Sequence, residues 1–219
     1  MDKISNFYEN NVFTLPEGID ISNNKYGVYL LATKKFKKGE TVFLFKCVTE
    51  YLKNIKKENQ VLKINNKGNL QKYNIEIFLH YSGVKNNTCM ITDFDCLMNH
   101  SCMPNIEHDE NDITIDSTNN VTTHKCYALK TINIGDELTC NYQKVYYKLD
   151  TPFDCLCGNA KCHKKIKGMK YLTLIEKIKL IICPINDHYK YKIIKDVFIN
   201  KYTIAIAIGI TTTIVFFIK

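Results

Sequence analysis

The sequence predicts a mostly β fold with short helices, followed by a C-terminal helix and a candidate transmembrane helix. A length of 219 residues, with 45% hydrophobic and 24% charged residues, suits one globular domain with an appendage. Short runs rich in Val, Tyr, Phe and Thr, divided by glycine turns, are typical of strands in small sheets. Toward the C-terminus the apolar residues change to helical spacing and then to one long uncharged run.

Strand-like runs extend from the N-terminus to about Tyr51, with turns at Gly27 and at residues 37–40. Residues 51–81 are rich in Lys and Asn and have apolar residues at helical spacing, so we expect one or two helices there. The apolar residues that carry this expectation are Ile75, Phe78 and Leu79.

The remainder of the chain returns to strands and then changes to a helix. Ile113 and Ile115 alternate with polar residues, which predicts a strand. Residues 126–142 follow the pattern of a strand, a turn at Gly135 and a second strand. Residues 171–182 have the apolar spacing of a helix.

Residues 202–218 form the longest uncharged run, and as a helix these 17 residues span ~25 Å. That length is close to the ~27 Å hydrocarbon core of a thin bilayer, and Lys201 and Lys219 bracket it. The alternatives are a buried β-branched strand or an unstructured end, which Gly209 favours. Because lysines precede the run, we expect a membrane anchor with the protein on the cytosolic face of a membrane; a nuclear location is the alternative.

All 30 basic residues are Lys, and they are concentrated toward the C-terminus. Residues 1–160 contain 18 Lys and 19 acidic residues, whereas residues 161–219 contain 12 Lys and 3 acidic residues. Arg supplies the paired hydrogen bonds that read guanine, so its absence argues against sequence-specific nucleic-acid binding. Weak, nonspecific nucleic-acid binding through contacts between Lys and phosphate groups is still an alternative.

The chain contains 10 cysteines and opens without the apolar stretch of a secretory signal, so we expect an intracellular protein with reduced thiols. Cys155, Cys157 and Cys162 have a close spacing that predicts a structural zinc site. Zinc needs a fourth ligand, and both the adjacent His163 and the remote Cys102 are candidates.

Residues 99–105, Asn-His-Ser-Cys-Met-Pro-Asn, form a segment dense in polar groups. By themselves they are compatible with a tight turn whose side chains are satisfied locally. They are also compatible with Cys/His nucleophilic chemistry, although no third orienting residue can be assigned.

Taken with three other segments in the same order, this segment resembles the SET-domain protein lysine methyltransferases. Residues 99–105 match the family's Asn-His-Ser-Cys-x-Pro-Asn element at every fixed position, and residues 132–142 are similar to its Ile-x-x-Gly-Glu-Glu-Leu-Thr-x-x-Tyr element. Residues 153–162 resemble its post-SET cysteine element, and residues 25–29 resemble its early glycine-containing element. The resemblance covers roughly residues 20–163, and no cysteine-rich pre-SET region is expected before them.

The resemblance implies a SET-domain β-clip-like fold of small, mostly antiparallel sheets, in which residues 99–105 pass under a loop as a pseudoknot. It implies a SET domain at 12–148 with an insert at about 51–90, a post-SET zinc segment at 150–164, a basic helical segment at 165–201 and the anchor at 202–218.

The resemblance also implies S-adenosylmethionine-dependent methylation of a protein lysine, with a histone tail as one candidate substrate. It makes Tyr142 the catalytic hydroxyl. The implied ligands of a structural zinc ion are Cys102, Cys155, Cys157 and Cys162. The implied contacts of the cofactor are Lys25, Tyr26, Gly27, Asn99 and His100. The implied walls of the substrate channel are Phe45, Cys140 and Phe153.

Two positions depart from the family pattern. Lys25 replaces a glycine that lets backbone approach the cofactor, and Cys140 replaces an aromatic residue. The smaller Cys140 leaves room for dimethylation or trimethylation, which is a hypothesis. The competing hypothesis is a SET-like scaffold that binds zinc at a membrane but has lost turnover. An acidic run beside the motif is either a solvated loop or a docking surface for a basic peptide; its members are Glu107, Asp109, Glu110, Asp112 and Asp116.

Overall fold

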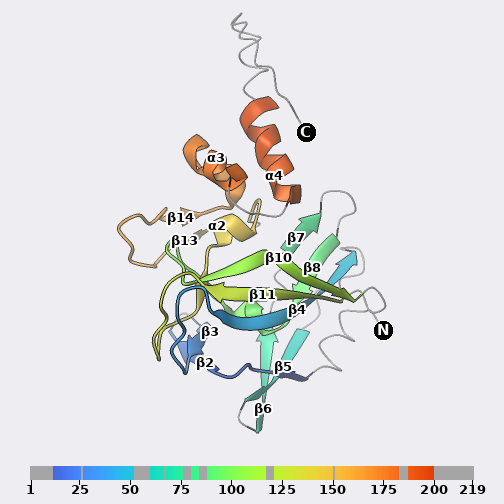
Figure 1. Cartoon of the computed structure of the whole chain (residues 1–219), viewed down its shortest axis with the longest axis vertical. Coiled ribbons are helices and arrows are strands. Elements are labelled where there is room, and N and C mark those ends of the chain that lie inside the picture. The colour runs from blue at the N-terminus through green and yellow to red at the C-terminus, as the bar shows by residue number, and fades with distance from the viewer. Residues whose placement is uncertain are drawn as a thin grey trace, which may run out of the picture.

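The computed structural model describes most of the chain between residues 12 and 199. The described residues are 12–25, 27–51, 60–66, 68–75, 80–83, 88–116, 121–149, 151–182 and 187–199. They form several small sheets with short helices, as Figure 1 shows, so the prediction of a mostly β fold is confirmed.

The largest sheet has five strands, and all neighbouring strands in it are antiparallel. In sheet order these are β10 (Ile106–Asp116), β11 (Val121–Ala128), β4 (Thr41–Tyr51), β8 (Thr88–Thr92) and β7 (His80–Gly83). Phe43, Phe45 and Cys47 of β4 are buried at every second position, because side chains of a strand alternate between its two faces. Leu44 between them is exposed, so one face of β4 packs on the core.

A second, three-stranded sheet lies below the first in Figure 1. It contains β1 (Val12–Thr14), which is parallel to β5 (Gln60–Asn66), and β6 (Asn69–Ile75), which is antiparallel to β5. Leu62 and Ile64 are fully buried with one residue between them, which is the period of a strand. A two-residue turn that contains Gly68 at a φ of 84° connects β5 to β6.

The prediction of helices in residues 51–81 is therefore wrong for residues 60–75. Ile75 is the last residue of β6, while Phe78 and Leu79 lie outside the described residues. The physical reason is that burial at alternate positions and the glycine turn fix a hairpin, which outweighs the weak helical spacing.

Pairs of short strands form the remaining β structure of the described residues. They are β2 (Ile19–Asn24) with β3 (Gly27–Ala32), β9 (Asn99–His100) with β12 (Thr139–Cys140), and β13 (Phe153–Asp154) with β14 (Lys165–Ile166). Only β9 and β12 are parallel among these pairs. Their pairing brings together two motifs that lie far apart in the sequence.

The helices of the described residues are short and concentrated toward the C-terminus. They are η2 (Phe94–Leu97), α2 (Tyr142–Val145), η3 (Met169–Tyr171), α3 (Leu174–Ile182), α4 (Asp187–Ile194) and η4 (Lys195–Ile199). The helix predicted at 171–182 is confirmed by α3. Thr173 and Glu176 begin this helix as a capping box, since the Glu176 carboxylate accepts hydrogen bonds from the Thr173 backbone N–H and hydroxyl at 2.9 and 2.6 Å.

Helices α3 and α4 pack around a small core of their own at one end of the molecule, as Figure 1 shows. This core contains Met169, Leu180, Ile193 and Val197. The Tyr147 hydroxyl donates a hydrogen bond to the Asp196 carboxylate at 2.6 Å, and Lys177 lies 3.8 Å from the same oxygen. These contacts therefore connect α3 and η4, which follows α4 directly, to the segment just after α2.

No helix within the described part of the chain is long and apolar enough to cross a bilayer. The predicted membrane anchor at 202–218 lies outside the described residues, so it stays a prediction.

Candidate active site and metal centre

The parallel pairing of β9 with β12 builds the centre of the site. Asn99 lies opposite Thr139, and His100 lies opposite Cys140. The Ser101 backbone N–H extends the pairing by donating a hydrogen bond to the Cys140 carbonyl at 2.9 Å. Residues 136–138 are in turn hydrogen-bonded to β3, so they lie between β3 and β9.

Residues 136–140 cross beside β9, and Asn105 stabilises this β9–β12 crossing from inside the protein. Asn105 is only 6% exposed. Its side-chain amide donates to the Glu137 carbonyl at 2.8 Å, and its side-chain oxygen accepts from the Thr139 backbone N–H at 2.8 Å. Its own carbonyl accepts a hydrogen bond from the Leu129 N–H at 2.9 Å. The buried Asn105 side chain thus satisfies the backbone groups of Glu137 and Thr139, the residues on either side of Leu138.

The side chain of Asn99 is held by a charged partner. Its amide donates a hydrogen bond to the Glu137 carboxylate at 2.8 Å. This bond involves an ionised acceptor and is therefore stronger than one between neutral groups. The first residue of the motif is consequently fixed in orientation.

His100 connects the candidate catalytic tyrosine to the cysteines. Its Nδ1 accepts a hydrogen bond from the Tyr142 backbone N–H at 3.0 Å, which places the proton of the neutral ring on Nε2. Nε2 lies 3.4 Å from the Cys102 sulfur, within range of an N–H···S hydrogen bond. Burial, helped by the nearby His163, lowers the pKa of His100 to about 4, so the ring is neutral at physiological pH.

Tyr142 begins α2 and lies among aromatic rings. Its hydroxyl donates a hydrogen bond to the Met98 carbonyl at 2.8 Å. The ring centroids of His100, Tyr146 and Phe153 lie 5.4, 5.4 and 6.0 Å from that of Tyr142. Burial raises the pKa of Tyr142 well above its usual range, so the hydroxyl keeps its proton.

The other candidate channel residues lie in the same core but have different neighbours. Phe45 is buried in β4 and its ring contacts two histidine rings, with His124 stacked at 5.1 Å and His108 tilted at 5.2 Å. Cys140 is buried opposite His100, and burial raises the pKa of its thiol. Phe153 of β13 is therefore the candidate channel residue whose ring lies nearest to that of Tyr142.

The candidate cofactor residues of the early element lie at a hairpin turn. Lys25 and Gly27 are exposed where β2 meets β3, and Gly27 has a φ of 125°. Tyr26 lies outside the described residues. The turn reaches the rest of the site through β3, whose Leu30 carbonyl accepts a hydrogen bond from the Leu138 N–H at 2.8 Å.

Four cysteine sulfurs from two distant segments meet beside this centre. The sulfurs of Cys102, Cys155, Cys157 and Cys162 all lie within 4.8 Å of one another. The Cys102 sulfur is 3.7 Å from that of Cys155 and 3.8 Å from that of Cys162. A zinc ion with four thiolates at about 2.3 Å holds neighbouring sulfurs about 3.8 Å apart, so the donor set fits tetrahedral zinc.

These positions group Cys102, and not the ring of His163, with the three clustered cysteines. His163 lies beside the cluster, but its ring forms an ion pair with Glu176 at 3.2 Å. Its backbone N–H instead donates to the Cys102 sulfur at 3.4 Å. N–H groups directed at a sulfur stabilise a thiolate, which is the form that binds metal.

The thiols differ in how readily they ionise. Burial raises the pKa of Cys155 to about 11. Burial would also raise the pKa of Cys157, but hydrogen bonds from the backbone of Asn159 and Cys102 outweigh it and lower this pKa to about 6. Because a bound cation deprotonates the thiols that coordinate it, the cluster as a whole is suited to a metal.

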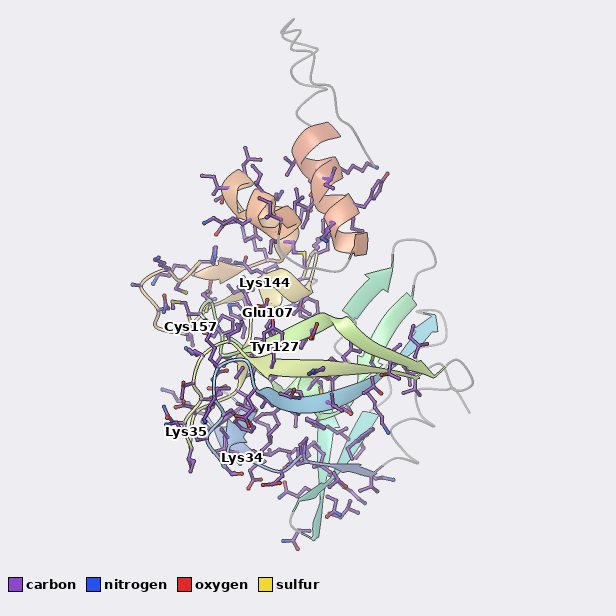
Figure 2. All side chains as sticks on the ribbon, viewed as in Figure 1. Lys34, Lys35, Glu107, Tyr127, Lys144 and Cys157 are labelled. Carbon is purple, nitrogen blue, oxygen red and sulfur yellow. The ribbon has the colours of Figure 1, made fainter. Side chains whose placement is uncertain are left out.

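An ion pair joins the site to the acidic strand beside it. Figure 2 labels Lys144 of α2 and Glu107 of β10 close together, and their charged groups lie 2.7 Å apart. Glu107 also faces Tyr127 across β10 and β11. The charge of Glu107 is therefore partly neutralised within the protein.

Comparison with known families decides the identity of the fold. The family described as SET domain matches residues 27–143, which is just over half of the chain. The chain belongs to the SET-domain family. The resemblance based on the four motifs is thereby confirmed, and the matched range ends one residue after Tyr142.

Relatives of this SET-domain chain include two curated proteins. A protein of Arabidopsis thaliana, ASHH4, which is named as a candidate histone-lysine N-methyltransferase, is 28% identical over 175 residues, 75% of this chain and 45% of that protein. The methyltransferase flvH of Aspergillus flavus is 30% identical over 70 residues, 32% of this chain and 34% of that protein. The chain thus spans less than half the length of these relatives.

Similar solved structures include two proteins. A candidate histone methyltransferase of Plasmodium falciparum has a TM-score of 0.40 and 19% identity, over 58% of this chain and 95% of that chain. KRYPTONITE in complex with mCHG DNA and SAH has a TM-score of 0.41 and 16% identity, over 67% of this chain and 28% of that chain.

The SET domain contains supporting residues to which the sequence analysis assigned no role. Asn105 closes the quoted motif, and Glu137 lies in the glycine-turn element, so both were visible in the sequence. Their hydrogen bonds depend on the β9–β12 crossing, which the local sequence does not specify. The contact of His100 with Tyr142 was likewise not predicted.

Replacing Asn105 tests the crossing directly. Asn105→Ala leaves the Glu137 carbonyl and the Thr139 N–H without their buried partner, so we expect it to lower the free energy of unfolding by about 2–4 kcal/mol. Urea denaturation measures this change. The control Asn133→Ala alters an exposed side chain and should change stability by less than about 0.5 kcal/mol. Equal stability of the two variants would contradict the role of Asn105.

Proposed function

We propose that the chain is an S-adenosylmethionine-dependent protein lysine N-methyltransferase. The single observation that carries the proposal is the position of Tyr142, whose neutral hydroxyl lies next to the Asn99–His100 strand and among aromatic rings. Membership of the SET-domain family supports the same reaction class.

The Tyr142 hydroxyl is suited to orient a substrate amine. The hydroxyl already donates its proton in a hydrogen bond to the Met98 carbonyl. The lone pairs of the hydroxyl oxygen can therefore accept a hydrogen bond from the amine. The hydrogen bond from the Tyr142 backbone N–H to His100 holds the backbone at this residue, while the bond to Met98 and the packing against Tyr146 orient the phenol. A fixed acceptor lowers the entropy cost of aligning the amine with the methyl donor.

The aromatic surroundings favour the reactive form of the substrate. A free lysine amine has a pKa of about 10.4, so it must lose a proton before it can act as a nucleophile. Contact with the rings of Tyr142 and Phe153 removes water from the amine and favours its neutral form. S-adenosylmethionine supplies an electrophilic methyl group, because its sulfur is positively charged. The amine lone pair would form the new N–C bond while the S–C bond breaks, which leaves a neutral thioether and a methylammonium product; the one proton released overall is the one that the substrate ammonium loses to solvent before attack.

Asn99 and His100 are the residues proposed to hold the cofactor, together with the hairpin turn at Lys25, Tyr26 and Gly27. The Glu137 carboxylate and the Tyr142 N–H hold the two side chains of β9 in place before any ligand binds. Such preorganisation reduces the ordering cost of binding.

We further propose that the four clustered cysteines bind a structural zinc ion. The ion would tie the Asn-His-Ser-Cys segment to the chain after β13, which carries Phe153. Apparent binding free energies of structural zinc reach roughly 10–16 kcal/mol, which is enough to order a short segment.

A histone tail is the candidate substrate, since the Arabidopsis relative is named as a candidate histone-lysine methyltransferase. The acidic residues of β10 are candidates for docking such a basic peptide. A histone substrate favours a chromatin location, whereas an anchor at 202–218 favours a membrane, so the two proposals make different predictions about location.

Labelled S-adenosylmethionine and a core-histone mixture test the proposed reaction. We expect the full chain to transfer label, and Tyr142→Phe to lower kcat by about tenfold or more, because a positioned hydrogen bond is lost. Tyr171→Phe is the matched control, since Tyr171 is exposed, and it should keep full activity.

The two unfavourable outcomes of this assay have different meanings. Equal labelling by the full chain and by Tyr142→Phe would remove Tyr142 from the mechanism. No labelling by the full chain, with intact zinc and fold, would support the competing hypothesis of a scaffold without turnover.

Cys140 provides a test of product range. Its small buried side chain lies opposite His100, and we propose that it leaves space for a methylated amine. The wild type should therefore produce dimethyl or trimethyl lysine, whereas Cys140→Phe should stop at monomethyl lysine. Mass spectrometry distinguishes these products, and Cys140→Ser is the control of similar volume. A wild type restricted to monomethyl lysine would contradict the proposal.

Elemental analysis tests the metal site. We expect one zinc ion per chain, and we expect Cys102→Ser to lose it together with a lower thermal midpoint, because three ligands hold zinc more weakly than four. Cys96→Ser is the control, since Cys96 lies outside the cluster and should leave the zinc content unchanged. Full zinc content in Cys102→Ser would show that this residue is not a ligand.

A further inference from the structure

Helix α3 presents an apolar stripe that is exposed in the described part of the chain. Leu180 on one side of the helix is buried against α4, whereas the other side carries four exposed apolar residues. These are Leu174, Ile175, Ile178 and Ile182, with exposed fractions of 40, 67, 40 and 79%. At 100° per residue they lie within an arc of about 100° on the helix surface, so they form a continuous strip.

Neighbouring elements of the same helical unit also carry exposed aromatic and apolar residues. Tyr171 of η3 is 51% exposed directly before α3, and Tyr191 of α4 is 65% exposed. Ile194, also on α4, is 39% exposed. Tyr side chains suit a boundary between water and an apolar phase, because one end of the ring is polar.

The charges beside the stripe are predominantly positive. Lys170, Lys179 and Lys195 are exposed on the same helical unit. Residues 161–219 include only three acidic residues, and two of them already have basic partners inside the protein. Glu176 pairs with His163, and Asp196 pairs with Lys177. The surface therefore offers cations next to apolar side chains and little negative charge.

The helical unit lies at one end of the long axis of the molecule, opposite the β5–β6 hairpin in Figure 1. In the sequence, this unit is followed after two further residues by the uncharged run 202–218.

We propose that the exposed face of α3, with Tyr171 and the flanking lysines, binds the surface of an anionic lipid bilayer. The apolar stripe inserts at the level of the headgroups, and the lysines contact anionic lipids. A short helix of this composition binds in the plane of the membrane, so the proposal does not depend on a transmembrane span. It is also independent of methyl transfer, because none of its residues belongs to the proposed active site.

The chain contains no Trp, which allows a single introduced Trp to report on one surface position. The full-length variant Ile175→Trp places the reporter in the stripe. Leu70→Trp places it on β6 at the opposite end, where Leu70 is 55% exposed. The probes are vesicles of phosphatidylcholine alone and of phosphatidylcholine with phosphatidylserine, and brominated lipids serve as quenchers.

We expect the emission of Ile175→Trp to move to shorter wavelength and to be quenched with the anionic vesicles only. Leu70→Trp should respond to neither vesicle. In co-sedimentation, Ile175→Glu combined with Ile182→Glu should raise the lipid concentration for half-maximal binding by about tenfold or more, while Leu70→Glu should not. Circular dichroism checks that each variant keeps the wild-type fold.

Three outcomes would overturn the proposal. The first is binding to vesicles without any response of Ile175→Trp, which would assign the contact to another part of the chain. The second is an equal response to neutral vesicles, which would exclude a role for anionic lipid. The third is a shift that depends on protein concentration without vesicles, which would make the partner a second copy of the chain.

Discussion

Four sulfur atoms from two distant segments meet in one place, and the geometry of the candidate active site depends on that meeting. Cys102 lies in the polar motif at residues 99–105, together with Asn99 and His100. The other three cysteines of the cluster follow Phe153 in the sequence. Holding the sulfurs together therefore holds the proposed cofactor strand beside one wall of the proposed channel. A single ion is sufficient for this, since its binding free energy exceeds the ordering cost of a few residues.

A network of hydrogen bonds extends the same constraint toward the tyrosine. His100 accepts from the Tyr142 N–H on one side and lies next to the Cys102 sulfur on the other. Asn105 and Glu137 hold the strands that cross at this point. Because these groups are partly or fully buried and are paired with one another, the site is ordered without a ligand, and Tyr142 has a defined position.

The sequence was sufficient to predict the family and the residues that gather at the site. The four motifs are local, and their order along the chain identified the SET domain together with the cysteines of the cluster. The β5–β6 hairpin was missed, because its alternating burial appears only when Leu62 and Ile64 pack against the rest of the core. The Lys144–Glu107 ion pair was also missed, since it joins α2 to a strand 37 residues away.

The supporting network around the motifs could not be predicted for a related reason. The hydrogen-bond partners of Asn99 and Asn105 depend on the parallel pairing of two strands of only two residues each. Such short strands have no periodicity that the sequence could reveal. The exposed stripe of α3, by contrast, follows from sequence spacing once the buried side of the helix is known. Local sequence patterns thus predicted individual motifs and the clustered cysteines. The contacts among them depend on pairing between residues far apart in the sequence.

X-ray absorption at the zinc edge of the purified full chain tests whether the four clustered cysteines bind one zinc ion. We expect a single shell of four sulfur ligands at about 2.3 Å, with no nitrogen or oxygen ligand. A shell that contains imidazole nitrogen, or a protein that carries no zinc when purified from zinc-containing medium, would contradict it. Either result would mean that the motif and the post-SET segment are joined in another way.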